Sequence, residues 1–175
     1  MMSDNLACQE EFWEELIDGK ITAMSPRPMV NHIRIAFRIA YLFESYFQGR
    51  KCTLFFEGVD LHLTQKDSFL PDMMVVCERE KIKIDGVYGA PDLVAEILSP
   101  SKAKRARGYK KGTCAKCGIQ EYWLVGPAEK SAEVYLKQRF VRPPRGLLHL
   151  PEGSFGKNDR EKAGHYCHQI QVQSL

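Results

Sequence analysis

Residues 90–100 read Ala-Pro-Asp-Leu-Val-Ala-Glu-Ile-Leu-Ser-Pro and carry the clearest structural signal in the chain. A short run between two prolines that is rich in Val, Ile and Leu is typical of a strand buried on both faces. Glu96 interrupts this run, and a carboxylate in an apolar strand is costly to desolvate unless a cation or hydrogen-bond donors meet it. The stretch therefore predicts a core strand whose carboxylate needs a partner.

A second apolar run shows the same anomaly. Residues 69–77 read Phe-Leu-Pro-Asp-Met-Met-Val-Val-Cys, with Asp72 at the start of the apolar part. We expect these two runs to be adjacent core strands. Mg²⁺ prefers oxygen ligands and usually takes one or two carboxylates together with waters and phosphate oxygens. Asp72 and Glu96 therefore indicate a site for a hard divalent cation, although a single acid in an apolar run is also typical of a strand end or a paired core carboxylate.

The segment after Glu96 is strongly basic. It holds seven cations within fifteen residues and no acid among them. These cations are Lys102, Lys104, Arg105, Arg107, Lys110, Lys111 and Lys116. Such a run is the electrostatic footprint expected where a phosphate backbone passes, and it is equally typical of a solvated helix face.

The remaining pattern predicts a hairpin, two helices and further strands. Asp18-Gly19 lies between short apolar runs and predicts the hairpin. The helices are expected at 29–47, where Ile33 and Phe37 belong to the apolar stripe, and at 101–117. Strands are expected at 52–63, 69–77, 91–98, 120–125 and 132–136, with a polar loop at 81–89. This order indicates an α/β sandwich built on a mixed sheet.

Bulk composition limits the class of protein. The chain has 175 residues, 44% hydrophobic and 27% charged, which predicts one soluble globular domain. The net charge of +3 is small, so nucleic-acid binding has to depend on where the cations lie. The first 20 residues do not resemble a signal peptide, and no run is apolar enough to span a membrane. Six cysteines at irregular spacings favour reduced thiols and a cytoplasmic location.

Three blocks of the sequence, at 69–76, 89–101 and 117–125, resemble the signature blocks of the Uma-type restriction endonucleases. That family belongs to the PD-(D/E)XK nuclease superfamily, and the resemblance runs from about Glu14 to Leu136. It implies a restriction endonuclease-like mixed β-sheet core flanked by helices. It also implies an endonuclease that hydrolyses DNA phosphodiester bonds with Mg²⁺, for which Mn²⁺ can substitute, and a homodimer is a reasonable assembly.

The resemblance also assigns roles to residues. Asp72 and Glu96 become the catalytic metal-binding carboxylates. The superfamily lysine normally lies two residues after the glutamate, where this chain has Leu98, and the register of the basic helix places the catalytic lysine at Lys110 instead. His32 matches a recurrent histidine and is an accessory candidate, although a satisfied core histidine is the commoner explanation. The DNA contacts are expected at Lys102, Lys104, Arg105, Arg107 and Lys111.

Three positions depart from the family pattern. Ala106 stands where an aspartate usually precedes the helix lysine, Cys114 where a tyrosine usually follows it, and Gly126 where an aspartate usually ends the Trp-Leu-Val block. An Asp-to-Lys pair at i,i+4 would orient the lysine and keep it charged. Its loss predicts a mobile Lys110.

Residues 1–140 are expected to form the endonuclease-like domain, and 141–175 an irregular tail. The tail has turn composition, little periodicity and no resemblance to the family, which suggests disorder or a slipped reading frame near 136–151.

Two other readings stay open. The basic helix would also suit a catalytically inactive nucleic-acid-binding relative. Alternatively, Cys114 and Cys117 together with His165, Cys167 and His168 could form a zinc-binding module, although the gap is longer than in a compact finger. A purely structural interaction protein would leave Asp72 and Glu96 without a role.

Overall fold

The computed structural model describes residues 13–24 and 29–137. The chain begins with hairpin β1 (Glu14–Ile17) and β2 (Lys20–Ala23), followed by helix α1 (Val30–Phe47). The central strands are β3 (Thr53–Phe56), β4 (Leu61–Thr64), β5 (Asp67–Phe69), β6 (Met73–Val76), β7 (Ile82–Lys83), β8 (Gly86–Tyr88) and β9 (Leu93–Ile97), with a 3₁₀ turn η1 (Arg79–Lys81) before β7. The last part comprises α2 (Ala103–Arg105), the π-helical η2 (Ala106–Lys110), α3 (Lys111–Cys117), β10 (Glu121–Gly126) and β11 (Ser131–Leu136).

The strands form two sheets, as the mixed α/β pattern predicts. One sheet has the order β2-β1-β5-β4-β8-β7, and the other has the order β11-β10-β9-β6-β3. In the second sheet β9 pairs in parallel with β10 and antiparallel with β6. The two apolar runs of the sequence are therefore hydrogen-bonded neighbours at the centre of this sheet.

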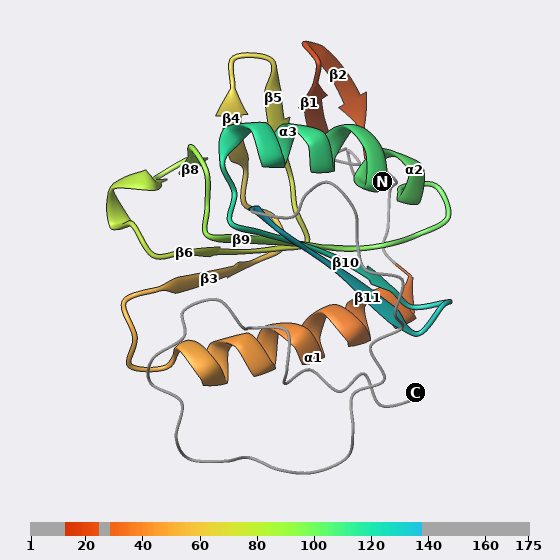
Figure 1. Cartoon of the computed structure of the whole chain (residues 1–175), viewed down its shortest axis with the longest axis horizontal. Helices are drawn as coiled ribbons and strands as arrows, with labels where there is room; N and C mark the ends of the chain where they lie inside the picture. Colours follow the sequence, from red (N-terminus) through yellow and green to blue (C-terminus); the bar gives the residue numbers. More distant parts are fainter. Residues whose placement is uncertain (1–12, 25–28, 138–175) are drawn as a thin grey trace, which may run out of the picture.

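The five-stranded sheet separates two hydrophobic cores. In Figure 1, α1 lies against one face of this sheet, while α2 and α3 lie on the opposite side together with the hairpins of the other sheet. The side chains of β6 alternate between the cores, with Met73 and Val75 on the α1 side and Met74 and Val76 on the other. Because both faces are covered, the strands read as continuous apolar runs.

Helix α1 confirms the predicted helix at 29–47 but not its whole apolar stripe. Its buried residues are Ile35, Ala36, Ile39, Ala40, Phe43 and Phe47. Ile33 and Phe37 were expected in the core, yet they are 46% and 64% exposed. The buried face is therefore rotated from the predicted one. No helix among the described residues is long and apolar enough to cross a membrane.

Other predicted elements need correction. The single strand expected at 52–63 is two strands in different sheets, because the chain turns at Glu57 and Gly58, both with positive φ. The loop expected at 81–89 contains the short antiparallel pair β7 and β8. The helix at 101–117 is present as α2, η2 and α3. The tail expected from 141 onwards lies outside the described residues.

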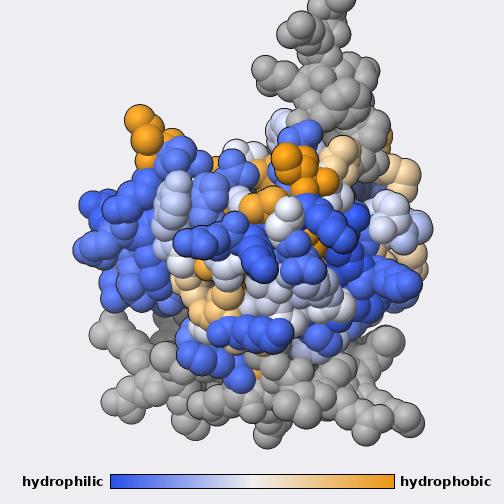
Figure 2. All heavy atoms as spheres, turned by 90° about the horizontal axis from the view of Figure 1, so that it is seen from above, coloured by the Kyte–Doolittle hydropathy of each residue, from blue (hydrophilic) through white to orange (hydrophobic). Residues whose placement is uncertain are grey.

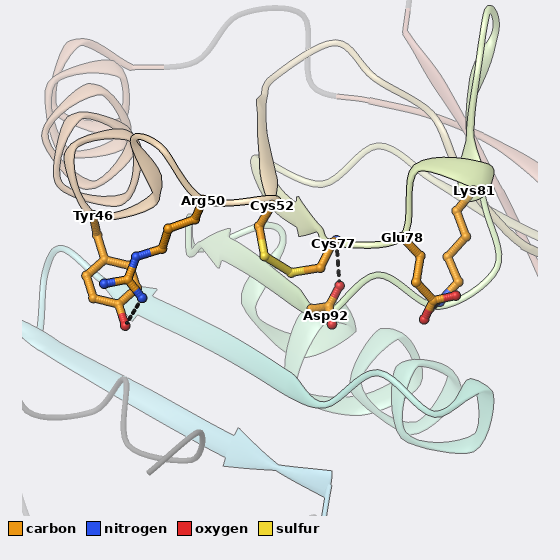
Figure 3. Close-up of a disulfide and its surroundings, with 7 residues drawn as sticks. All are labelled: Tyr46, Arg50, Cys52, Cys77, Glu78, Lys81 and Asp92. Atoms are coloured by element: carbon orange, nitrogen blue, oxygen red, sulfur yellow. Dashed lines mark hydrogen bonds and ion pairs between the residues drawn. A yellow bond between two sulfur atoms is a disulfide. The ribbon is translucent and has the colours of Figure 1, made fainter. Parts of the chain in front are cut away.

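The prediction of reduced thiols is wrong for Cys52 and Cys77. These residues form a disulfide between the ends of β3 and β6, and the Asp92 carboxylate accepts a hydrogen bond from the Cys77 amide (Figure 3). The antiparallel register pairs Thr53 with Val76, so the two cysteines face each other one step further along. Irregular cysteine spacing could not reveal this pairing, because it depends on the register of two strands 25 residues apart.

Candidate active site

Asp72 and Glu96 meet across two paired strands. The register of β6 and β9 pairs Met73 with Ala95, so one further step brings Asp72 opposite Glu96. Asp72 and Glu96 are 6% and 3% exposed. The backbone N–H of Ile97 donates a hydrogen bond of 2.6 Å to Asp72 Oδ2. The sheet thus fixes two buried carboxylates side by side, as the two interrupted runs predicted.

Lys110 reaches the same carboxylates from a helical segment, η2, and not from the sheet. Its ammonium lies 2.8 Å from Glu96 Oε1, and the residue is 4% exposed. Lys110 ends the π-helical segment η2, whose wider turn changes the direction of the side chains, and such segments are frequent at functional sites. The mobility expected from Ala106 is therefore wrong, since Lys110 is buried and held.

Glu15 explains why Lys110 is held. Its Oε1 atom lies 2.5 Å from Lys110 Nζ and also accepts a 2.9 Å hydrogen bond from the Leu70 amide. Glu15 belongs to β1 and is 3% exposed. The sequence analysis missed this residue, because its only signal is an acid in the short hairpin strand. A carboxylate far away in sequence thus pairs with Lys110, although position 106 carries alanine.

The pKa values of Glu96 and Lys110 depend on burial and on the charges beside them. Burial is the largest influence on Glu96 and raises its pKa, with a further rise from Asp72 and Glu15 that Lys110 opposes. Burial by itself lowers the pKa of Lys110, but Glu96 and Glu15 outweigh burial, so the pKa is raised. Lys110 therefore stays an ammonium ion at neutral pH. This arrangement keeps a cation in a dry site lined by carboxylates.

His32 and Glu57 approach Asp72 from the other side. His32 Nε2, on α1, lies 3.3 Å from Asp72 Oδ1 and 3.9 Å from Glu57 Oε1. Glu57 Oε1 is buried and has no hydrogen-bond partner in the structure. The His32 side chain is 11% exposed, so it is half-buried at the margin of the core and has acidic partners, as a satisfied histidine would. It also lies directly beside a predicted metal ligand, and Glu57 was not anticipated.

The predicted DNA-contacting cations differ in their surroundings. Lys104 and Arg105 are exposed, and Lys102 is half-buried. Arg107 pairs with Glu133 at 2.7 Å, and Lys111 lies 4.4 Å from the centre of the Tyr135 ring. Figure 2 looks onto the side of the molecule where α3 and the hairpins lie, and most of that surface is hydrophilic. Arg105 also forms an ion pair with Glu15 at 4.0 Å, so three of the five cations have a partner within the chain.

Cys114 and Cys117 have surroundings unlike those of zinc ligands. Cys114 is fully buried in the core beside the helix, and burial raises the pKa of both thiols. Zinc binds the thiolate form, which burial in apolar surroundings disfavours. The other proposed ligands, His165, Cys167 and His168, lie outside the described residues. Cys114 instead packs in the hydrophobic core beneath α3.

The carboxylate oxygens of the site suit a divalent cation. In this structure the ammonium of Lys110 supplies the positive charge beside Glu96. Within 13–24 and 29–137, no three His, Cys, Asp or Glu side chains already have the spacing of a metal centre. However, Asp72, Glu96 and Glu57 offer carboxylate oxygens, and one oxygen of Glu57 is buried without a partner. Carboxylates of this kind are the ligands that hard divalent cations take. The residues present therefore fit such an ion.

Comparisons with known proteins agree with this geometry. Residues 6–153 match the model of the Uma2 family, described as "Putative restriction endonuclease". An uncharacterised protein of Synechocystis sp. is 30% identical over 125 residues, which are 70% of this chain and 65% of that protein. The chain thus spans less than two thirds of this relative. A crystal structure from Anabaena variabilis, described as "a putative nuclease belonging to DUF820", has a TM-score of 0.61 and 28% identity over 71% of this chain and 72% of its own.

Proposed function

The chain belongs to the Uma2 family, and we propose that it is a metal-dependent endonuclease that hydrolyses phosphodiester bonds in DNA. One observation carries the proposal. The structure joins Asp72, Glu96 and Lys110 in one buried group, although they come from two strands and a helix. Two carboxylates can hold a metal ion and a lysine can stabilise the charge on the scissile phosphate, and both contributions accelerate phosphodiester hydrolysis.

The chain's own groups divide the work. Asp72 and Glu96 would hold Mg²⁺, or Mn²⁺ in its place. When bound, such an ion lowers the pKa of a water molecule and stabilises the charge that develops on the phosphoryl oxygens. Lys110 provides a fixed positive charge for the scissile phosphate, and Glu15 keeps this ammonium in place. Water attacks phosphorus and releases a proton, the bond from phosphorus to the leaving oxygen breaks, and that oxygen takes up a proton, so that the elements of one water molecule are added overall.

The substrate contacts follow from the exposed cations. Lys104 is fully available to the DNA backbone, whereas Lys102 is half-buried and Arg105 also lies 4.0 Å from Glu15, with Arg107 and Lys111 at the margin. A DNA substrate supports a cytoplasmic location as part of the proposal, whereas the Cys52–Cys77 disulfide does not. We also propose a homodimer, supported by the exposed apolar side chains of Val30, Phe37 and Tyr41 on α1, and its mass in solution would test this.

A second candidate is a catalytically inactive relative that binds nucleic acid. It is favoured by the observation that Lys110 contacts two carboxylates at once, which neutralises its charge, while Ala106 has lost the usual aspartate. Both candidates bind DNA, and they differ only in whether the DNA is cleaved. An inactive relative would bind DNA with a strong salt dependence and cleave nothing.

Nicking of supercoiled plasmid tests the proposal. We expect the wild type to nick DNA in Mg²⁺ or Mn²⁺, and Glu96→Gln and Lys110→Met to reduce the rate to background. Glu121→Gln is the matched control, because Glu121 is also a buried carboxylate of this sheet but hydrogen-bonds Trp123 instead of the cluster. Equal residual nicking by wild type and Glu96→Gln would indicate a contaminant and overturn the proposal.

A further inference from the structure

Asp72 has two further neighbours besides the Glu96–Lys110 pair, and these are His32 and Glu57. His32 comes from α1, Glu57 from the turn after β3, and Asp72 from the residue before β6. Asp72 uses Oδ2 for the Ile97 amide, while Oδ1 faces His32 Nε2 at 3.3 Å. His32 Nε2 is also 3.9 Å from Glu57 Oε1. His32 Nε2 therefore lies near one carboxylate oxygen of each acid, although the three side chains do not yet have the spacing of a metal centre among the described residues.

Glu57 is held there at a cost in free energy. Its φ is 48°, a region that residues other than glycine seldom adopt. Its Oε1 atom is buried without a hydrogen-bond partner, and an unsatisfied buried acceptor destabilises the folded chain. The Glu57 amide nevertheless fixes the turn by donating to the Asp72 carbonyl at 3.0 Å. Strain and an orphaned oxygen at one residue are typical of a site that awaits a ligand.

We propose that His32 and Glu57 are further ligands of the metal ion that Asp72 holds. This inference rests on the proposed function and extends it to the choice of metal. An imidazole nitrogen discriminates against Mg²⁺, which prefers an all-oxygen shell, and favours first-row transition ions. The site therefore selects Mn²⁺ over Mg²⁺, and His32 is the residue that sets this preference.

A purely structural role for His32 makes a different prediction. A protonated imidazole that only pairs with Asp72 and Glu57 would contribute to folding stability and leave the metal preference unchanged. Affinities for two metals and a spectroscopic signature of nitrogen ligation therefore separate the two roles without any measurement of catalysis.

The experiment titrates the full chain with Mn²⁺ and Mg²⁺ by calorimetry and records pulsed electron paramagnetic resonance of the Mn²⁺ complex. We expect nitrogen hyperfine coupling in the wild type and its loss in His32→Gln, with Mn²⁺ affinity weakened about tenfold or more. Mg²⁺ affinity should fall less, so the preference for Mn²⁺ shrinks. Glu57→Gln should weaken both ions and keep the nitrogen coupling. His62→Gln is the matched control, since His62 contacts Ser68 and Tyr88 instead.

Unchanged affinities in both variants, with no nitrogen coupling in the wild type, would overturn the inference. If that protein still nicked plasmid in Mg²⁺ and lost Mg²⁺ binding in Asp72→Asn, the proposed function would stand without it. Absence of metal binding and nicking in the wild type would overturn both. Circular dichroism checks that each variant is folded, and Glu57→Gln provides the reading if His32→Gln is not.

Discussion

The ammonium of Lys110 lies 2.5 Å from the carboxylate of Glu15, although the two residues are 95 positions apart in the chain. Both side chains are almost completely buried. Glu15 reaches this point because Asp67 ties the hairpin down, accepting hydrogen bonds from the Asp18 amide and from the Tyr109 hydroxyl. The hairpin is therefore part of the candidate active site.

Breaking the Glu15–Lys110 pair should be strongly destabilising. A buried pair that loses one partner leaves an uncompensated charge, which typically costs about 3–5 kcal/mol. We expect costs in this range for Lys110→Met, and a smaller cost for Glu15→Gln because Glu96 still balances the lysine. The double variant should be more stable than the sum of the single losses predicts, by about 1 kcal/mol or more. Urea unfolding of the four proteins measures this coupling, and strict additivity would contradict it.

Restoring the family aspartate should not help this chain. Ala106 is 2% exposed and lies four residues before Lys110, so Ala106→Asp would add a third carboxylate around one ammonium. We expect this variant to lose about 1–3 kcal/mol of stability and to gain no nicking activity. The double variant Ala106→Asp, Glu15→Gln should be more stable and should nick more DNA than the single variant Glu15→Gln. A gain of activity from Ala106→Asp on its own would show that Glu15 does not replace the aspartate.

The five predicted DNA-contacting cations should contribute unequally. Each phosphate contact adds about 0.9 to the slope of log affinity against log salt. We expect Lys104→Ala to lower the slope by roughly this amount, and Arg105→Ala to lower it less because Arg105 lies 4.0 Å from Glu15. Arg107→Ala should lower it less, because Arg107 is engaged with Glu133. Lys83→Ala is the control, since Lys83 is exposed on the far edge strand β7. Fluorescence anisotropy with duplex DNA at several salt concentrations provides the slopes.

The residues that mark the centre of the site were visible in the sequence. Glu96 and Asp72 each interrupt an apolar run, and such runs are identified by local composition alone. The two carboxylates lie side by side because their two buried strands pair with each other. Lys110 was placed by resemblance to a family, since seven basic residues cannot be told apart by charge.

The rest depends on long-range geometry. Glu15, Glu57 and the bond between Cys52 and Cys77 become meaningful only when strand register and the turn after β3 are known. The exposed positions Ile33 and Phe37 show the same limit. Helical periodicity indicates that a helix is amphipathic, but the rotation of its buried face is decided by the sheet against which it packs.

Acid should weaken the fold in part through Glu133. Burial raises the pKa of Glu133, but hydrogen bonds from Tyr135 and Arg107 outweigh burial, so the pKa lies below its value of 4.5 in the unfolded chain. Because the folded pKa is the lower one, the stabilisation is complete well above pH 4.5 and is lost as pH falls through the folded pKa. Glu133→Gln should therefore be less stable than wild type at neutral pH, and the gap should close in acid. A gap independent of pH would contradict this.

The Cys52–Cys77 bond should make stability depend on redox conditions. It closes a loop of 25 residues between strands that lead to Glu57 and Asp72. A loop of this length is worth about 3 kcal/mol by constraining the unfolded chain. We expect a Cys52→Ser, Cys77→Ser double variant to lose about this much against the oxidised wild type, and to match the wild type in excess reductant. Cys117→Ser is the control, because Cys117 carries a free thiol. Urea unfolding with and without reductant gives the comparison, and a wild type indifferent to reductant would show that the bond does not form in solution.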